Sequence, residues 1–221
     1  MDTNQSVQRV MVVGAGPVGL AVAAALAAQG IAVDLIDKRP IAPPYSRAFG
    51  LEPITLELLN TWGVADEMIR RGIVWSSAPL GDRAGRTLSF SHLPCEYPYM
   101  VIIPQSQTES ILTEWALRVG VNLQRGYKAT ALVVHQDSVE VTLEHGDPVR
   151  QHLVKYDWVL GADGVNSTVR QLLDIPFLGQ DYPHSLVVAD VLLQHPPSPA
   201  VHARSVCLLY TSDAADDLTR V

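Results

Sequence analysis

The first forty residues alternate between short apolar runs and one alanine-rich segment. Residues 10–13 are apolar and rich in β-branched side chains, as expected for a buried parallel strand. Residues 17–29 are rich in alanine and leucine, begin with a proline that a first helical turn tolerates, and precede Gly30, a typical helix stop. A second apolar run over residues 31–36 ends at Asp37. The pattern predicts strand, helix and strand, the size of one βαβ crossover.

A membrane span or signal segment is the alternative for this region, because residues 10–33 contain no charged side chain. Three glycines and a proline interrupt the stretch near its start, and a strand-like run ending in an acidic residue follows. These features favour the βαβ unit, so we expect no membrane segment.

Helical periodicity returns in three places further along the chain. EPITLELLNTWG (residues 52–63) and VADEMIRRG (residues 64–72) each predict a helix that ends at a glycine. Residues 73–103 lose this periodicity and gain glycine, proline and aromatic residues, which indicates strands and loops. Apolar positions recur at helical spacing between residues 108 and 119, so a third helix should return the chain to the core.

Strand patterns dominate the remainder. Residues 129–160 hold three pieces, TALVV, VEVTL and HLVKYDWVL, which we interpret as an antiparallel meander whose last strand leads into GADG. STVRQLL (residues 167–173) predicts a short helix, and another strand is expected over residues 184–193.

Composition and charge exclude several classes of protein. A hydrophobic content of 48% supports a real core. Sixteen Lys and Arg against 23 Asp and Glu give a net charge of −7 without a long basic run, so we expect no nucleic-acid partner. Cys95 and Cys207 lack a CxxC spacing and the histidines are scattered, which argues against a disulfide framework and a metal site. A reducing cytoplasm fits this cysteine usage.

Gly14, Gly16 and Gly19 form a GxGxxG pattern between the first predicted strand and helix. Gly14 permits a tight turn, Gly16 lets the backbone approach a pyrophosphate, and Gly19 lets helix and strand pack closely. The helix amino terminus offers N–H groups to the phosphate, and Asp37 can accept hydrogen bonds from a ribose diol. The set predicts dinucleotide binding, with glycines used only for packing as the alternative. It does not separate NAD from FAD.

Four segments in order carry a more specific resemblance: GAGPVGL, SRAFGLEPITLELLNTWGV, YPYMVIIPQSQTE and YDWVLGADGVNSTVR. They resemble the FAD-dependent aromatic hydroxylases related to para-hydroxybenzoate hydroxylase, most of all the branch acting on phenols and polyketide aromatics. The resemblance covers about residues 8–195. It implies an α/β fold, with a Rossmann-like FAD-binding domain of the glutathione-reductase type, a β-meander and a partial sheet-based substrate domain.

The implied domains interleave along the chain. Residues 1–72 and 104–176 are assigned to the FAD-binding domain, and residues 73–103 and 177–206 to the partial substrate domain. CLLYTSDAADD, within residues 207–221, resembles the translation of a sequencing adapter. We interpret this segment as a non-native tail, with an ordinary surface tail as the alternative.

The resemblance also assigns cofactor contacts to individual residues. Arg47 is expected along the FAD phosphates and ribityl chain, since a guanidinium makes paired, charge-assisted bonds to phosphate oxygens. Gln105, in a turn before the long helix, is expected on the flavin, and Asp163 on a ribityl hydroxyl. Val18, within the glycine-rich motif, and Lys38, just after the second strand, complete the expected set.

Neighbours of Asp163 receive structural interpretations. Gly161 and Gly164 should allow unusual backbone angles beside an extended cofactor. Ser167 and Arg170 are expected to cap and anchor the following helix.

The implied reaction is aromatic hydroxylation, in which NAD(P)H reduces FAD, O2 adds to the reduced ring, and a hydroxyl group passes to an activated aromatic substrate. The flavin performs this chemistry while the protein binds, orients and excludes water, so no catalytic residue is assigned. Tyr97 and Tyr99 could face the substrate, although a core position is the more common case for such aromatics.

The chain departs from the family pattern at its end. Family members continue with the rest of the substrate domain, a GD motif and a helix amino terminus that contact the flavin from the other side, and none of these precedes Val221. We therefore expect this chain alone to bind FAD weakly and to turn over little or no substrate. Another FAD-dependent oxidoreductase, such as a reductase or halogenase, and a non-enzymatic FAD-binding fragment stay open. A purely NAD-dependent dehydrogenase would leave GADG unexplained.

Overall fold

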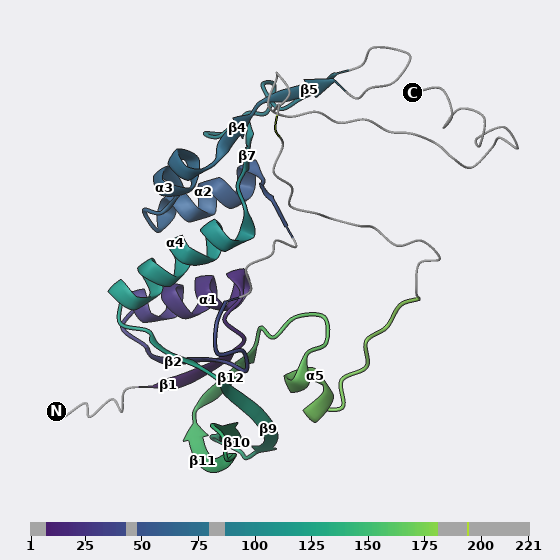
Figure 1. Ribbon diagram of the computed structural model, residues 1–221. Helices are drawn as coiled ribbons and strands as arrows, with labels where there is room; N and C mark the ends of the chain where they lie inside the picture. The colour runs from purple at the N-terminus through teal and green to yellow at the C-terminus, as the bar shows by residue number, and fades with distance from the viewer. Residues whose placement is uncertain (1–7, 43–47, 80–86, 181–193, 195–221) are drawn as a thin grey trace, which may run out of the picture.

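The central feature of the molecule is a four-stranded parallel sheet (Figure 1). The structure, a computed structural model, describes residues 8–42, 48–79, 87–180 and 194. The sheet has the order β12-β1-β2-β8, formed by β1 (Arg9–Val13), β2 (Ala32–Asp37), β8 (Asn122–Arg125) and β12 (Trp158–Gly161). The predicted βαβ unit is therefore confirmed, since α1 (Pro17–Ala28) connects β1 to its parallel neighbour β2.

Two different layers cover the two faces of this sheet (Figure 1). On one face α1 packs against α4 (Gln105–Arg118), and α2 (Pro53–Thr61) and α3 (Ala65–Arg71) lie beyond them. On the other face lies the antiparallel meander of β9 (Tyr127–Val134), β10 (Val139–His145) and β11 (Arg150–Tyr156). A short helix, α5 (Thr168–Leu172), follows β12 and contacts β9. This is the α/β arrangement with a meander that the sequence predicted.

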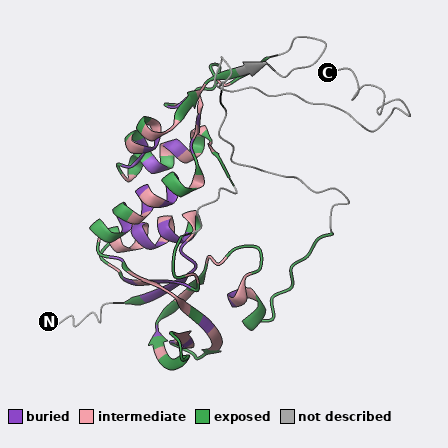
Figure 2. Cartoon of the chain, viewed as in Figure 1, coloured by how far each residue is buried: buried purple, intermediate pink, exposed green. Residues whose placement is uncertain are grey.

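The side chains of β1 alternate between two cores. Val10 and Val12 belong to the cluster under the helices, whereas Met11 and Val13 belong to the cluster under the meander. Because successive side chains of a strand point to opposite faces, a strand covered on both sides is apolar throughout. Figure 2 shows buried residues along α1, α4 and the sheet beneath them. The central strands thus hold their carboxyl ends rigidly between two packed layers.

Smaller sheets lie at the far end of the helical layer. One joins β3 (Gly50–Leu51), β7 (Met100–Ile102) and β4 (Ile73–Trp75), and the other joins β5 (Ser77–Pro79) and β6 (Thr87–Ser89). The ring of Tyr97 is buried in the helix-side core and packs edge-on against Tyr99. The core interpretation of Tyr97 is therefore confirmed.

The piece HLVKYDWVL was predicted as one meander strand, and this prediction was wrong. β11 ends at Tyr156, and β12 pairs in parallel with β1 in the central sheet. Between them, the Asp157 carboxylate accepts a hydrogen bond from the Arg9 N–H at 2.7 Å, and the Asp157 N–H donates to the Arg9 carbonyl at 3.0 Å. This long-range pairing moves the chain from one sheet to the other, so that GADG follows a central strand.

Other boundaries also differ from the sequence pattern. The strand β8 was missed because its NLQR sequence contains no apolar run. The helix expected over residues 108–119 begins earlier, at Gln105. The strand expected over residues 184–193 lies outside the described residues. None of the helices in the described ranges is long and apolar enough to cross a membrane.

Candidate functional site

A cleft of about 360 Å³ lies at the carboxyl ends of β1 and β2, within the size range of small-molecule sites. The turn after β1, the start of α4 and the segment after β12 all line it. The predicted cofactor residues that it brings together are Gly14, Gly16, Val18, Asp37, Lys38, Gln105 and Asp163. Gly19 does not line the cleft, and Arg47 lies outside the described residues.

Gly14 and Gly19 lie so close to other backbone atoms that neither position has room for a side chain. Gly14 has a φ of +106°, and a Cβ there would lie 2.5 Å from the carbonyl oxygen of Ala162. A Cβ on Gly19 would lie 1.8 Å from the carbonyl oxygen of Gly14. These two glycines therefore lock the turn, the helix and the GADG segment together, as expected for the third glycine of such a motif.

Gly16 differs because the space beside it is open. A Cβ on Gly16 would meet no heavy atom of the described chain within 4 Å, although the residue lines the cleft. Gly16 is also the N-cap of α1, and within the described ranges no side chain caps this helix end. The first turn contains no acidic residue. The free N–H groups at the start of α1, together with the positive end of the helix dipole, therefore face the cleft. This arrangement binds phosphate.

Asp37 is buried and surrounded by donors. Its carboxylate accepts hydrogen bonds from the Ala15 N–H at 2.9 Å, from the Arg39 N–H at 2.8 Å, and from two guanidinium nitrogens of Arg39 at 3.0 Å each. Burial alone would raise its pKa, but the hydrogen bonds from Arg39 and Ala15 outweigh burial and hold the pKa below the usual value for an aspartate. Four bonds occupy the acceptor sites of a carboxylate, so a ribose hydroxyl would have to share or replace one of them.

Arg39 also lines the cleft and was missed in the sequence. Its side chain is 38% exposed and forms an ion pair with Asp37. The signal that could have found it is the Asp-x-Arg spacing directly after β2, which returns the guanidinium to the acid at the strand end.

Gln105 is the first residue of α4 and not part of a preceding turn, since Pro104 is the N-cap. Its side-chain Nε2 donates to Glu109 Oε1 at 2.7 Å. Glu109 is only 3% exposed and also lines the cleft. Its other oxygen, Oε2, has no hydrogen-bond partner in the part of the chain that the structure describes. Its spacing of one helical turn from Gln105 was the available signal.

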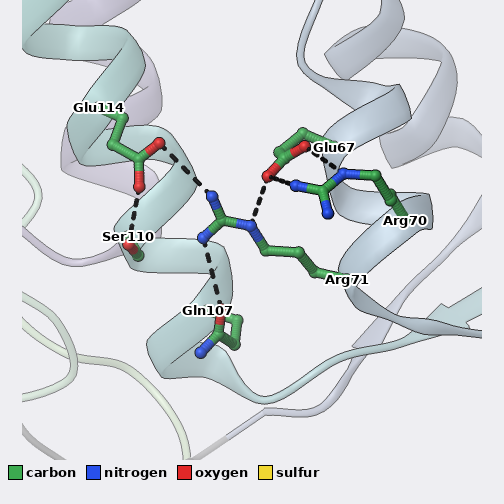
Figure 3. Close-up of polar contacts among 6 residues, drawn as sticks. All are labelled: Glu67, Arg70, Arg71, Gln107, Ser110 and Glu114. Carbon is green, nitrogen blue, oxygen red and sulfur yellow. Dashed lines mark hydrogen bonds and ion pairs between the residues drawn. The ribbon is translucent and has the colours of Figure 1, made fainter.

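The opposite face of α4 is tied to α3 through Arg71 (Figure 3). The Arg71 guanidinium donates to Glu67 on its own helix, reaches Gln107 Oε1 at 3.4 Å and lies 3.5 Å from Glu114 Oε2. Glu114 also accepts a hydrogen bond from the Ser110 hydroxyl at 3.1 Å. These contacts hold the outer face of α4, so that Gln105 is presented to the cleft from a fixed helix.

Asp163 caps the start of α5. One carboxylate oxygen accepts from the Ser167 hydroxyl, and the other accepts from the backbone N–H groups of Thr168 and Val169. Ser167 Oγ in turn accepts from the Arg170 N–H at 3.0 Å, so the capping role predicted for Ser167 is confirmed. Asp163 therefore stands at the cleft wall as part of a capped turn.

The expectation of unusual backbone angles is confirmed for one of the two glycines around Asp163. Gly164 has a φ of +86°, the predicted unusual backbone angle. Gly161 lies in β12 and has no positive φ, so that prediction was wrong for it. A Cβ there would lie 2.9 Å from Val169, which shows that Gly161 makes room for α5.

Two of the histidines, which show no metal-ligand spacing in the sequence, contact each other in the structure. His145 and His152 stack across β10 and β11, with their Nε2 atoms 2.6 Å apart, and His145 stacks on Tyr127. Among the described residues there is no group of three side chains that could hold a metal ion.

Comparisons with known proteins agree with this geometry. The FAD binding domain family matches residues 8–217. The chain is 34% identical over 194 residues to an uncharacterized aromatic compound monooxygenase from Bacillus subtilis (strain 168), covering 86% of this chain and 38% of that protein. It is 37% identical over 186 residues to anhydrotetracycline monooxygenase from Streptomyces rimosus, covering 82% of this chain and 35% of that protein.

Among solved structures, OxyS anhydrotetracycline hydroxylase from Streptomyces rimosus matches with a TM-score of 0.72 and 33% identity, covering 79% of this chain and 36% of that chain. The chain thus spans 35 to 38% of the length of these curated relatives. The match also decides between NAD and FAD, which the glycine fingerprint left open. The protein belongs to the FAD binding domain family.

Proposed function

We propose that the cleft binds FAD and that this chain is the FAD-binding part of a monooxygenase that uses NAD(P)H and O2 to hydroxylate an aromatic substrate of the phenol or polyketide class. One observation carries the cofactor assignment. Gly16, at the start of α1, has open space beside it and lines the same cleft as Gln105 and Asp163, and no side chain of the described residues caps this helix end. The named activities of the relatives support the reaction class.

The residues lining the cleft fit the parts of FAD. The turn of Gly14 and Gly16 and the N–H groups at the start of α1 would hold the pyrophosphate. Asp37 and Lys38, at the end of β2, would lie at the adenosine ribose. A dinucleotide running from there toward α4 would bring its ribityl chain to Gln105.

Further charges and contacts complete the proposed site. Arg39 and Lys128 add positive charge to the cleft walls, which suits a pyrophosphate. Asp163 is proposed as a ribityl contact, in addition to its capping role. Arg47, outside the described residues, stays a predicted phosphate contact.

FAD in this cleft would supply the redox and oxygen chemistry, and the residues of this chain would bind and orient it. The N–H groups of α1 would fix the phosphates without a counter-ion. The Arg71 contacts of α4 would keep Gln105 at a constant position against the cofactor.

Titration of the purified chain with FAD, followed by flavin absorption and fluorescence, tests the cofactor assignment. We expect saturable one-to-one binding, weaker than in a full-length relative, and little or no substrate-stimulated NAD(P)H oxidation. Gly16→Ala should weaken FAD binding at least about tenfold, because its methyl group would stand where the phosphate approaches. The variant should still fold, since the methyl group has open space. An unaltered FAD affinity in Gly16→Ala would contradict the proposal.

A further inference from the structure

Glu109 is a buried carboxylate of which only one oxygen has a hydrogen-bond partner among the described residues. Oε1 accepts from Gln105 Nε2 at 2.7 Å, whereas Oε2 is buried and has no partner within the described ranges. Leaving a buried polar atom unpaired costs free energy, and an ionised carboxylate costs the most. Such an atom in a native structure calls for a physical explanation.

Packing alone does not explain the acid. The neighbouring buried positions of α4, Ile111 and Leu112, are apolar, and a side chain such as Leu or Met would fill this position without an unpaired oxygen. The guanidinium of Arg39, which lines the same cleft, forms an ion pair with Asp37. Among the described residues, no salt bridge between Arg39 and Glu109 is found.

The chemistry of Oε2 restricts what could complete it. An ionised carboxylate only accepts hydrogen bonds, so a matching ligand group must donate one. The phosphate oxygens of a dinucleotide are acceptors and repel it. The sugar and polyol hydroxyls of a dinucleotide are donors, and Glu109 lines the cleft one helical turn from Gln105.

We propose that Glu109 is a cofactor-binding residue whose Oε2 accepts a hydrogen bond from a sugar or polyol hydroxyl of bound FAD. The inference rests on the proposed function of the cleft. The bond from Gln105 to Oε1 fixes the carboxylate so that Oε2 is the remaining acceptor, and it fixes the orientation of the Gln105 amide in return. Bound FAD would thus pair an oxygen that the described chain leaves without a partner at a cost in stability.

The decisive variant is Glu109→Gln, which keeps the size of the side chain and removes the charged acceptor. We expect its FAD dissociation constant, from a fluorescence titration, to rise at least about tenfold, the loss for one hydrogen bond to a charged group. Its unfolding midpoint without FAD should be unchanged or higher, because a buried unpaired charge has been removed. If Glu109 served only to stabilise the fold, the unfolding midpoint of Glu109→Gln would instead be lower than that of the wild type.

Glu144→Gln is the control. Glu144 lies on β10, accepts a hydrogen bond from Gln151 at 2.9 Å and does not line the cleft, so the FAD affinity of this variant should equal that of the wild type. Wild-type affinity in Glu109→Gln would overturn the inference while leaving the proposed function intact. A lower midpoint together with equal weakening of every ligand would also overturn it.

Competition by ADP and by FMN identifies the hydroxyl. A Glu109→Gln loss confined to ADP places the contact at the ribose, and a loss confined to FMN places it at the ribityl chain; either result supports the inference. Failure of the wild-type chain to bind FAD at all would overturn the proposed function, and the inference with it.

Discussion

Two buried carboxylates face the same cleft, and they differ in what surrounds them. Asp37, at the end of β2, accepts four hydrogen bonds from Ala15 and Arg39. Glu109, on α4, accepts one from Gln105 and leaves Oε2 without a partner among the described residues. The first acid is completed by the protein and organises the glycine-rich turn. The second, which also lines the cleft, keeps one oxygen unpaired among the described residues.

The glycines of the turn repeat this contrast in the backbone. Gly19 has the carbonyl oxygen of Gly14 where its Cβ would be, whereas Gly16 has open space. Groups completed within the protein should control stability, and groups left open should control ligand binding. A substitution of a completed group that changed only ligand binding, or of an open group that changed only stability, would contradict this distinction.

Gly19→Ala should have the largest effect. Its Cβ would lie 1.8 Å from a backbone carbonyl oxygen, which a flexible side chain cannot relieve. We expect a loss of unfolding free energy of more than about 3 kcal/mol, or no folded protein. Circular dichroism and urea denaturation measure this, with Gly16→Ala as the folded control. A Gly19→Ala protein as stable as the wild type would contradict the observed packing.

Asp37→Ala should have the next largest effect. It leaves the Ala15 N–H and the Arg39 guanidinium without their shared acceptor. We expect a loss of about 3 kcal/mol in urea denaturation, as for breaking a buried pair. An undiminished stability would show that Asp37 is not the organiser of the turn.

The pH dependence of stability should separate Asp37 from the other acids. Its pKa in the folded protein is lowered by the hydrogen bonds from Arg39 and Ala15, so on acidification this carboxylate is protonated in the unfolded state first. The stability that Asp37 contributes is present above about pH 4 and is lost as the pH falls toward its lowered folded pKa. Asp37→Asn should therefore lose less stability than the wild type between about pH 5 and pH 3. Parallel curves for the two proteins would contradict this assignment.

Glu109→Gln should have the smallest effect on stability without ligand. We expect a change of no more than about 1 kcal/mol, toward higher stability, because the unpaired charge is removed and Gln105 keeps an acceptor. Urea denaturation beside Asp37→Ala gives the direct contrast. A loss of unfolding free energy comparable to that of Asp37→Ala would show that both acids stabilise the fold.

Local spacing was enough to predict one residue on each side of this comparison. GxGxxG and the acid at the end of the second strand lie within one βαβ unit, so Gly16 and Asp37 could be assigned from sequence. The sequence did not predict that Arg39 would occupy acceptor sites of the Asp37 carboxylate, because this depends on the conformation of the long Arg39 side chain. Glu109 required knowing that α4 begins at Gln105 and which of its faces meets the cleft.

The segment that leads into GADG was predicted less well from its hydrophobic pattern. A continuous alternation through HLVKYDWVL hides the point where the chain changes sheets. That point is set by the pairing of Asp157 with Arg9, which are 148 residues apart. The capping bonds of Asp163 are local by contrast, since they join it to residues four to six positions later in the chain.

Thermal unfolding with and without FAD tests the central claim that the open groups of the cleft serve the cofactor. At a fixed concentration, a ligand that binds only the folded state raises the unfolding midpoint more when it binds more tightly. FAD should raise the midpoint of the wild-type chain, and at the same FAD concentration should raise those of Gly16→Ala and Glu109→Gln clearly less. A wild-type midpoint that FAD leaves unchanged, or equal shifts in all three proteins, would contradict the account.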